Sequence, residues 1–213
     1  MQYFTFEPDA EAGRVYPQVS TATLVGSMIS IDDWPTKDTV KSLVPRLEPG
    51  AVVTDLLSEA ATSAYGFLIS PRLREYFASF TLMDHRLYDC PVVGEVAELK
   101  GYVWLHMFDP ELINALDYNS SSFMEEDCFD EIGPIKIRSL AHYHDLKSKD
   151  AEASFGVTLS EIRFKAESPK YDMFAIHPFT SDVLVSEKLR DGLLKLGLTG
   201  VEFNDGPEVV FAT

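Results

Sequence analysis

Two segments of this chain share one residue pattern, which constrains how both can fold. Residues 67–80 read FLISPRLREYFASF and residues 183–196 read VLVSEKLRDGLLKL. Each has an apolar triplet, a serine and an amphipathic run, and the serines, Ser70 and Ser186, are 116 positions apart. The repeat predicts two similar units, each a strand, a serine cap, a helix and a further strand.

Each serine stands where a helix N-cap is expected. A serine oxygen can accept a hydrogen bond from a free backbone N–H in the first turn. Pro71 and Glu187 follow, and both suit the first helical position: proline lacks an N–H, and an acidic group favours the positive helix end. Neither serine lies in a Gly-x-Ser-x-Gly turn. We therefore interpret Ser70 and Ser186 as structural helix caps and not as nucleophiles.

The remaining pattern indicates more strands than helices. Short alternating or β-branched segments recur along the chain, and the two clear helices each lie between strands. This predicts an α+β fold with a mixed, mainly antiparallel sheet. With 213 residues, the chain is expected to form a single domain, 1–213, in which two pseudo-repeated halves meet near 124–134.

The charge balance narrows the choice of partners. The chain has 34 acidic and 18 Lys or Arg residues, a net charge of −16. Such a chain repels phosphates, so we expect no binding to nucleic acid or to an anionic membrane. It suits a basic partner, although an acidic surface also serves solubility alone.

The sequence also indicates a compartment. The first residues lack a basic stretch followed by an apolar one, and no segment approaches the ~20 apolar residues of a membrane span. Cys90 and Cys128 are the only cysteines and are interpreted as thiols in a reducing compartment. We expect a cytoplasmic protein.

No catalytic set is evident among the polar residues. His142 and His144 would share one face of a strand. No third potential metal ligand follows at a sequence spacing that is typical of metal sites. His106 lies among aromatic residues and is interpreted as a hydrogen-bonded core residue. There is no glycine-rich phosphate loop. The sequence predicts no catalytic residue, no metal and no cofactor.

The densest acidic cluster is the best candidate for a binding site. Five carboxylates within seven positions repel one another unless they are solvated or meet cations. An apolar residue between charges is typical of partner sites. The simpler alternative is a solvated loop. A second, weaker candidate is Trp34 with Asp32, Asp33 and Asp38. The predicted partner-binding residues are Glu125, Glu126, Asp127, Phe129, Asp130 and Glu131.

Several segments, in this order, carry a resemblance to a known family: Tyr3-Phe4, 67–73, 102–105, 115–118 with Ser121 or Ser122, 183–189 and 198–203. Their order and spacing resemble the predicted immunity proteins of bacterial polymorphic-toxin loci, immunity protein family eleven. The resemblance implies a non-enzymatic cytoplasmic protein that binds and neutralises a cognate toxin, delivered by contact-dependent, type VI or related secretion. It brings no catalytic residues.

Two other interpretations stay open. One is an uncharacterised enzyme, such as a hydrolase that uses a carboxylate or His106. The other is an acidic scaffold or regulatory protein that binds a partner without neutralising a toxin. The immunity interpretation predicts a basic toxin as partner.

Overall fold

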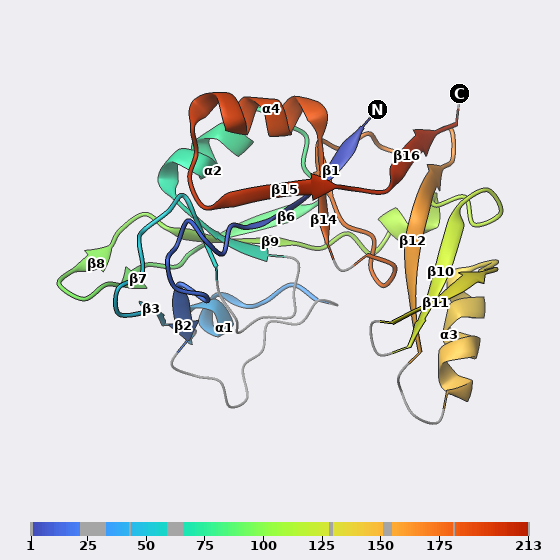
Figure 1. Cartoon of the computed structure of the whole chain (residues 1–213), viewed down its shortest axis with the longest axis horizontal. Helices are drawn as coiled ribbons and strands as arrows, with labels where there is room; N and C mark the ends of the chain where they lie inside the picture. Colours follow the sequence, from blue (N-terminus) through green and yellow to red (C-terminus); the bar gives the residue numbers. More distant parts are fainter. Residues whose placement is uncertain are drawn as a thin grey trace.

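The structure is a computed structural model that describes residues 2–21, 33–42, 44–58, 66–127, 130–150, 155–180 and 182–212. In these residues the strands form four four-stranded sheets, with few helices (Figure 1). Most strand pairs are antiparallel, which confirms the predicted α+β fold.

The strands of the two central sheets flank the Ser-capped helices. One sheet has the order β4 (Leu56–Leu57), β5 (Gly66–Ile69), β9 (Val103–Met107), β6 (His85–Asp89). The other has the order β13 (Met173–Phe174), β14 (Val183–Ser186), β1 (Tyr3–Pro8), β15 (Val201–Asp205).

The remaining strands form two outer sheets. One has the order β2 (Val19–Thr21), β3 (Pro45–Leu47), β7 (Val92–Val93), β8 (Glu98–Leu99). The other has the order β11 (Asp130–Ile135), β10 (Ser122–Asp127), β12 (Phe155–Phe164), β16 (Glu208–Phe211). The helices are α1 (Lys37–Ser42), α2 (Pro71–Phe77), the 3₁₀ helix η1 (Leu112–Ala115), α3 (Leu140–Lys149) and α4 (Glu187–Leu196).

Both predicted serine caps are present. Ser70 Oγ accepts from the Leu73 N–H at 3.1 Å, and Ser186 Oγ accepts from the Leu189 N–H at 3.2 Å. Helix α4 ends at Gly197, whose positive φ of 60° suits a residue without a Cβ. The repeated sequence pattern therefore folds into a repeated local structure.

The repeat extends over the whole molecule. Each half contains several strands before a Ser-capped helix and at least two strands after it, and the element order of β1 to β8 resembles that of β9 to β16. The first strands are exchanged between the halves. Strand β1 pairs with β14 and β15, whereas β9 pairs with β5 and β6.

The element order places the boundary between the halves near residue 100, where β8 ends and β9 begins. This differs from the boundary expected near 124–134, because that segment contains the hairpin of β10 and β11 inside the second half. A glycine and a proline there, Gly133 and Pro134, belong to strand β11. They therefore lie within a strand and do not mark a linker.

Helices α2 and α4 lie next to each other on one side of the molecule (Figure 1). A Cβ on Gly192 would lie 1.7 Å from the Tyr76 hydroxyl oxygen, so the two helices approach closely there. These two residues are again 116 positions apart. Arg72 on α2 also donates to the carbonyl oxygen of Leu196 at the end of α4. The helices therefore meet about a local pseudo-twofold axis.

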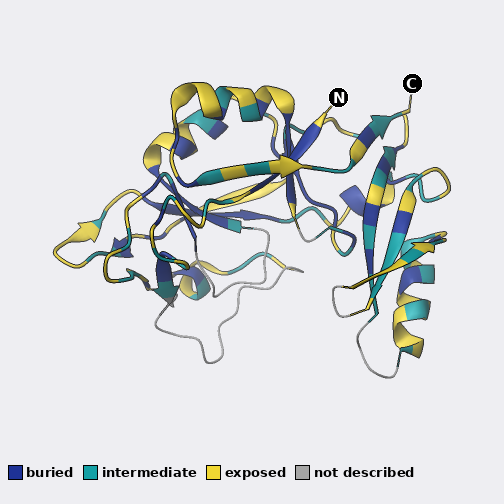
Figure 2. Cartoon of the chain, viewed as in Figure 1, coloured by how far each residue is buried: buried dark blue, intermediate teal, exposed yellow. Residues whose placement is uncertain are grey.

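Buried apolar side chains form one large cluster between the Ser-capped helices and the sheets and continue under α3. A second, smaller cluster lies on the other face of β9, around Val19, Val92 and Trp104. Figure 2 shows buried residues concentrated in the central strands, while much of α3, α4 and β11 is exposed.

Candidate functional site

The predicted partner-binding segment forms a β-hairpin. The acidic residues belong to β10 and β11, which pair in antiparallel fashion at one edge of the outer sheet. Phe129 and Cys128 lie outside the described residues. Strand β10 continues the sheet to β12, so the hairpin is anchored on one side by a long neighbour. The acidic segment is therefore built on a strand pair and is not a simple loop.

Two pairs of acidic residues face each other across this hairpin. Glu126 lies opposite Glu131, and Asp127 lies opposite Asp130. Like charges directly opposite each other in antiparallel strands destabilise the pairing. The hairpin forms against this repulsion, and cationic groups brought next to it would relieve it.

The described structure supplies no cation for these acids. No ion pair joins Glu125, Glu126, Asp127, Asp130 or Glu131 to a basic side chain in the described ranges. The Thr158 hydroxyl donates to Glu126 Oε1 at 3.1 Å, which is a neutral partner.

The lysines on the neighbouring helix α3 are engaged elsewhere. Lys149 pairs with Asp145 at 2.7 Å, and the Lys147 ammonium lies over the Tyr143 ring. Neither lysine therefore forms an ion pair with the hairpin acids in the described part of the chain.

The apolar residues next to the acids differ in how far they are buried. Phe123 is 3% exposed and packs against Phe179, so it belongs to the core. Ile132 is 61% exposed, and it is the extra residue where the pairing register shifts between Glu125 and Glu126. Ile132 is the apolar contact that sequence reasoning missed, although its position between the acids and Gly133-Pro134 could have indicated it.

The outer edge of β11 is protected against pairing with another strand. It carries Pro134, which has no N–H to donate, together with charged residues and the bulge at Ile132. These are the features that natural sheets use to block edge-to-edge pairing. A partner would therefore meet the hairpin through its side chains.

The second acidic candidate is organised around a packed tryptophan. Asp32 lies outside the described residues, whereas Asp33, Trp34 and Asp38 are described. The Arg86 guanidinium lies 4.2 Å from the centroid of the Trp34 ring, and Trp34 also packs edge-on against His106. Because its ring is already covered by these contacts, Trp34 is a poor anchor for a partner.

His106 is fully buried on β9, as predicted for a core residue. Its Nε2–H donates to the Asp33 carbonyl at 3.1 Å, and its Nδ1 has no hydrogen-bond partner in the structure described. Burial, together with the nearby Arg86 guanidinium, lowers the pKa of His106 to about 4, against the opposing effects of the Asp33 hydrogen bond and the Asp33 charge. The imidazole is therefore neutral at physiological pH.

The expectation that His142 and His144 lie on a strand was wrong. Both belong to helix α3, whose N-cap Ser139 accepts from the His142 N–H at 3.1 Å. Residues two apart on a helix point to different sides. His142 Nδ1 accepts from the Arg138 N–H, whereas His144 lines a cavity of about 260 Å³.

That cavity also contains His177 and Asp109 among mainly apolar walls. Asp109 is engaged: it accepts from the N–H groups of Glu111 and Leu112, and from the Tyr171 hydroxyl at 3.3 Å. Among the described residues, no group of three or more His, Cys, Asp or Glu side chains is arranged to hold a metal ion.

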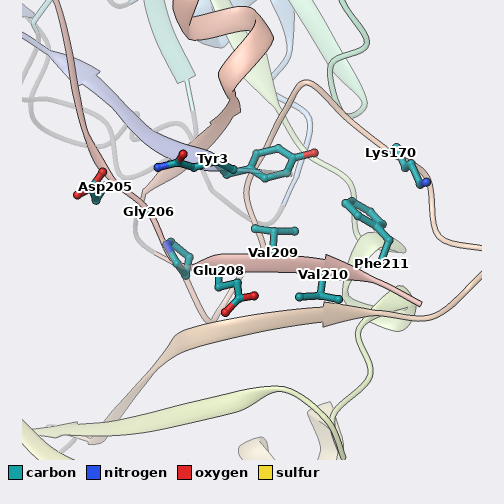
Figure 3. A pocket seen from close by; sticks show the side chains of 10 residues that line it. Tyr3, Lys170, Asp205, Gly206, Glu208, Val209, Val210 and Phe211 are labelled. Carbon is teal, nitrogen blue, oxygen red and sulfur yellow. The ribbon is translucent and has the colours of Figure 1, made fainter. Parts of the chain in front are cut away.

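A separate cleft of about 680 Å³ lies beside strand β16 (Figure 3). Its walls come from the start of β1, from Lys170 and from the turn between β15 and β16. Figure 3 shows Tyr3 and Val209 on facing sides of this space. The residues that line it are Gln2, Tyr3, Lys170 and 205–211. Sequence reasoning did not single out this cleft, because its walls come from distant parts of the chain.

The comparisons with known proteins leave the family open. No family model matches this chain, and no curated protein matches it. Among the described residues, no helix has the length and apolar character needed to cross a membrane.

Proposed function

We propose that this chain is a non-enzymatic immunity protein that binds a cognate secreted bacterial toxin in the cytoplasm and neutralises it. The observation that carries the proposal is the facing of like charges across the β10–β11 hairpin. Two acid–acid pairs in register, with no described basic partner, favour a cationic surface as the missing counterpart. The resemblance to immunity proteins supplies the class of partner.

The geometry supports side-chain recognition by the hairpin. The acids stand on paired strands, so their backbone is already ordered before binding and loses little further conformational entropy. Ile132 adds an exposed apolar group beside them. An apolar contact ringed by charge is a common arrangement in protein interfaces.

Charge also supports rapid association. The net charge of −16 attracts a basic toxin over distances of about a Debye length, ~8 Å at physiological salt. Electrostatic attraction of this kind raises association rates. Fast capture is what a cell needs if it is to neutralise a toxin that enters it.

The test replaces all five acids by their amides, Glu125→Gln, Glu126→Gln, Asp127→Asn, Asp130→Asn and Glu131→Gln. The toxin tested is the product of the adjacent gene. We expect its affinity to fall by about 10- to 100-fold at low salt and the salt dependence of binding to become flatter.

A matched control removes the same number of charges from exposed acids elsewhere. The positions are Glu75, Glu95, Glu98, Glu167 and Glu202, each changed to Gln. If both variants bind with the same affinity and salt dependence, the hairpin is not the recognition element, and the proposal in this form is wrong.

A further inference from the structure

Strand β16 has an unpaired outer edge. It ends its sheet and pairs in parallel with β12 only. The Ala212 N–H donates to the Phe164 carbonyl at 3.0 Å, toward β12. Because backbone groups alternate in direction along a strand, the N–H groups of Val209 and Phe211 point away from β12. No strand of the described residues pairs with β16 on that side.

In the first half of the molecule, the strand that corresponds to β16 is paired along the corresponding edge. Strand β7 corresponds to β16, since Arg46 of β3 lies opposite Val93 just as Arg163 of β12 lies opposite Val210. Arg46 and Arg163 are 117 positions apart, and so are Val93 and Val210. Both neighbours are parallel, so the two halves match in strand direction as well as in register.

The halves differ on the other side of these strands. Strand β7 has a second neighbour, β8, which pairs with it in antiparallel fashion with Val92 opposite Leu99. In the described residues of the second half no strand occupies the corresponding place beside β16.

The place that β8 would occupy is a cleft. The cleft of about 680 Å³ borders β16 along 208–211 and is open to solvent (Figure 3). This volume lies within the range of about 300–1,000 Å³ that is typical of ligand pockets. The missing neighbour therefore leaves room for a bound segment.

We propose that the outer edge of β16 binds an extended segment of a protein partner, in the antiparallel orientation that β8 adopts beside β7. Addition of a strand to an open edge gives affinity through main-chain hydrogen bonds and specificity through alternate side chains. This proposal does not depend on the acidic hairpin, which lies at the opposite edge of the same sheet.

The residues that line the cleft indicate the amino-acid composition of the bound segment. Val209 is 2% exposed and corresponds to Val92, so the residue opposite it should be apolar, as Leu99 is opposite Val92. Asp205 and Glu208 are exposed at the cleft. Lys170 lies over the Phe211 ring at 5.5 Å. Both acids lie toward the Glu208 end of β16 and favour a basic residue at that end of the segment, whereas Lys170 lies beside Phe211 at the other end (Figure 3).

Strand β8, which pairs with β7 in the first half, provides the sequence of a probe peptide. We would use a synthetic peptide with the sequence of residues 94–101, in which Glu95→Lys and Glu98→Lys make it basic. A control peptide also carries Leu99→Pro, which removes both the apolar side chain and an N–H.

The readout is hydrogen exchange of single backbone amides in the full chain, followed by NMR. With the basic peptide at saturation, exchange at Phe211, which is only partly buried, should slow by about tenfold or more. Exchange at Val210 and Ala212 should change little, since these N–H groups already point toward β12. The control peptide should protect none of them.

A protein variant checks the charge argument. Asp205→Lys with Glu208→Lys should weaken binding of the basic peptide by about tenfold, whereas Glu167→Lys with Glu202→Lys should not. The proposal is overturned if the basic peptide gives no saturable protection, if its effects are confined to the β10–β11 hairpin, or if both double variants bind it equally.

Discussion

Ser70 and Asp55 are joined by two hydrogen bonds: the Ser70 hydroxyl donates to Asp55 Oδ1 at 2.8 Å, and the Ser70 N–H donates to the Asp55 carbonyl at 2.8 Å. Ser186 and Asp172 repeat both contacts, at 2.9 and 2.8 Å. Each cap is thus itself fixed by an aspartate that precedes the unit.

The aspartates also connect the two halves. Asp55 Oδ2 accepts from the Thr199 N–H, which follows α4, and Asp172 Oδ2 accepts from the Thr81 N–H, which follows α2. Each unit therefore contributes an acid that binds the far end of the other unit. This reciprocal pair of contacts stabilises the arrangement of α2 and α4.

We expect Ser70→Ala and Ser186→Ala each to lower the free energy of unfolding by about 2 kcal/mol, since each removes a cap and leaves an aspartate oxygen without its donor. Ser139→Ala is the matched control, because Ser139 caps α3 without an aspartate partner among the described residues, and it should cost about 1 kcal/mol. Urea denaturation measures all three. Equal losses at the three sites would mean that the aspartates add nothing.

Gly192 should resist replacement because of Tyr76. On an exposed helix, Gly→Ala normally stabilises by up to ~1 kcal/mol. Here a Cβ would lie 1.7 Å from the Tyr76 hydroxyl oxygen, so the ring must move away from α4. We expect Gly192→Ala to destabilise the protein, but to stabilise it when Tyr76→Ala is also present. Thermal unfolding of the four proteins of this cycle gives the answer, and a stabilising Gly192→Ala in the parent chain would contradict it.

His106 should make stability depend on pH. Its pKa is lowered from 6.5 to about 4 in the folded state, so the unfolded chain takes up a proton first as the pH falls. The free energy of unfolding should therefore decrease between pH 6.5 and about 4, and this contribution should be constant above and below that window. Arg86 and the Asp33 carbonyl are the charged or polar groups that shift this pKa.

The check is the same pH series on His106→Gln, which cannot take up this proton. Carboxylates titrate in both proteins, so the difference between the two curves isolates the imidazole. Parallel curves from pH 7 to pH 4 would show that His106 is not held neutral by the fold.

Reversing one charge in the hairpin should raise the stability of the protein and lower its affinity for a basic partner. Glu131→Lys places an ammonium opposite Glu126 and turns a repulsive pair into an attractive one. We expect the free energy of unfolding to rise by about 0.5–1 kcal/mol and the affinity for a basic partner to fall. The control, Glu95→Lys on an exposed loop, makes the same change in net charge and should do neither. A loss of stability in Glu131→Lys would contradict the register described for this hairpin.

The sequence predicts the features that have strong local signals. The Ser70 and Ser186 caps follow from a serine before an amphipathic run. The burial of His106 follows from its apolar neighbours. These features depend on a few residues close together in the chain.

Long-range features could not be predicted in the same way. The exchange of β1 and β9 between the halves leaves no local mark, because each strand keeps an ordinary apolar pattern. The sequence of helix α3 is mostly polar and has no clear apolar stripe, so it predicts a strand at His142 and His144 and gives no signal for the helix that Ser139 caps. The cleft beside β16 joins residues from both ends of the chain, so only the folded structure reveals it.

The most direct test of the account is a growth-rescue assay with the toxin encoded by the adjacent gene. Cells that express this toxin should survive when the parent chain or the control with five exposed acids replaced is co-expressed. They should die when the five hairpin acids Glu125, Glu126, Asp127, Asp130 and Glu131 are replaced by amides, although this variant folds. If no chain rescues growth, the immunity function is contradicted; if the hairpin variant rescues as well as the parent, the hairpin is not where the toxin binds.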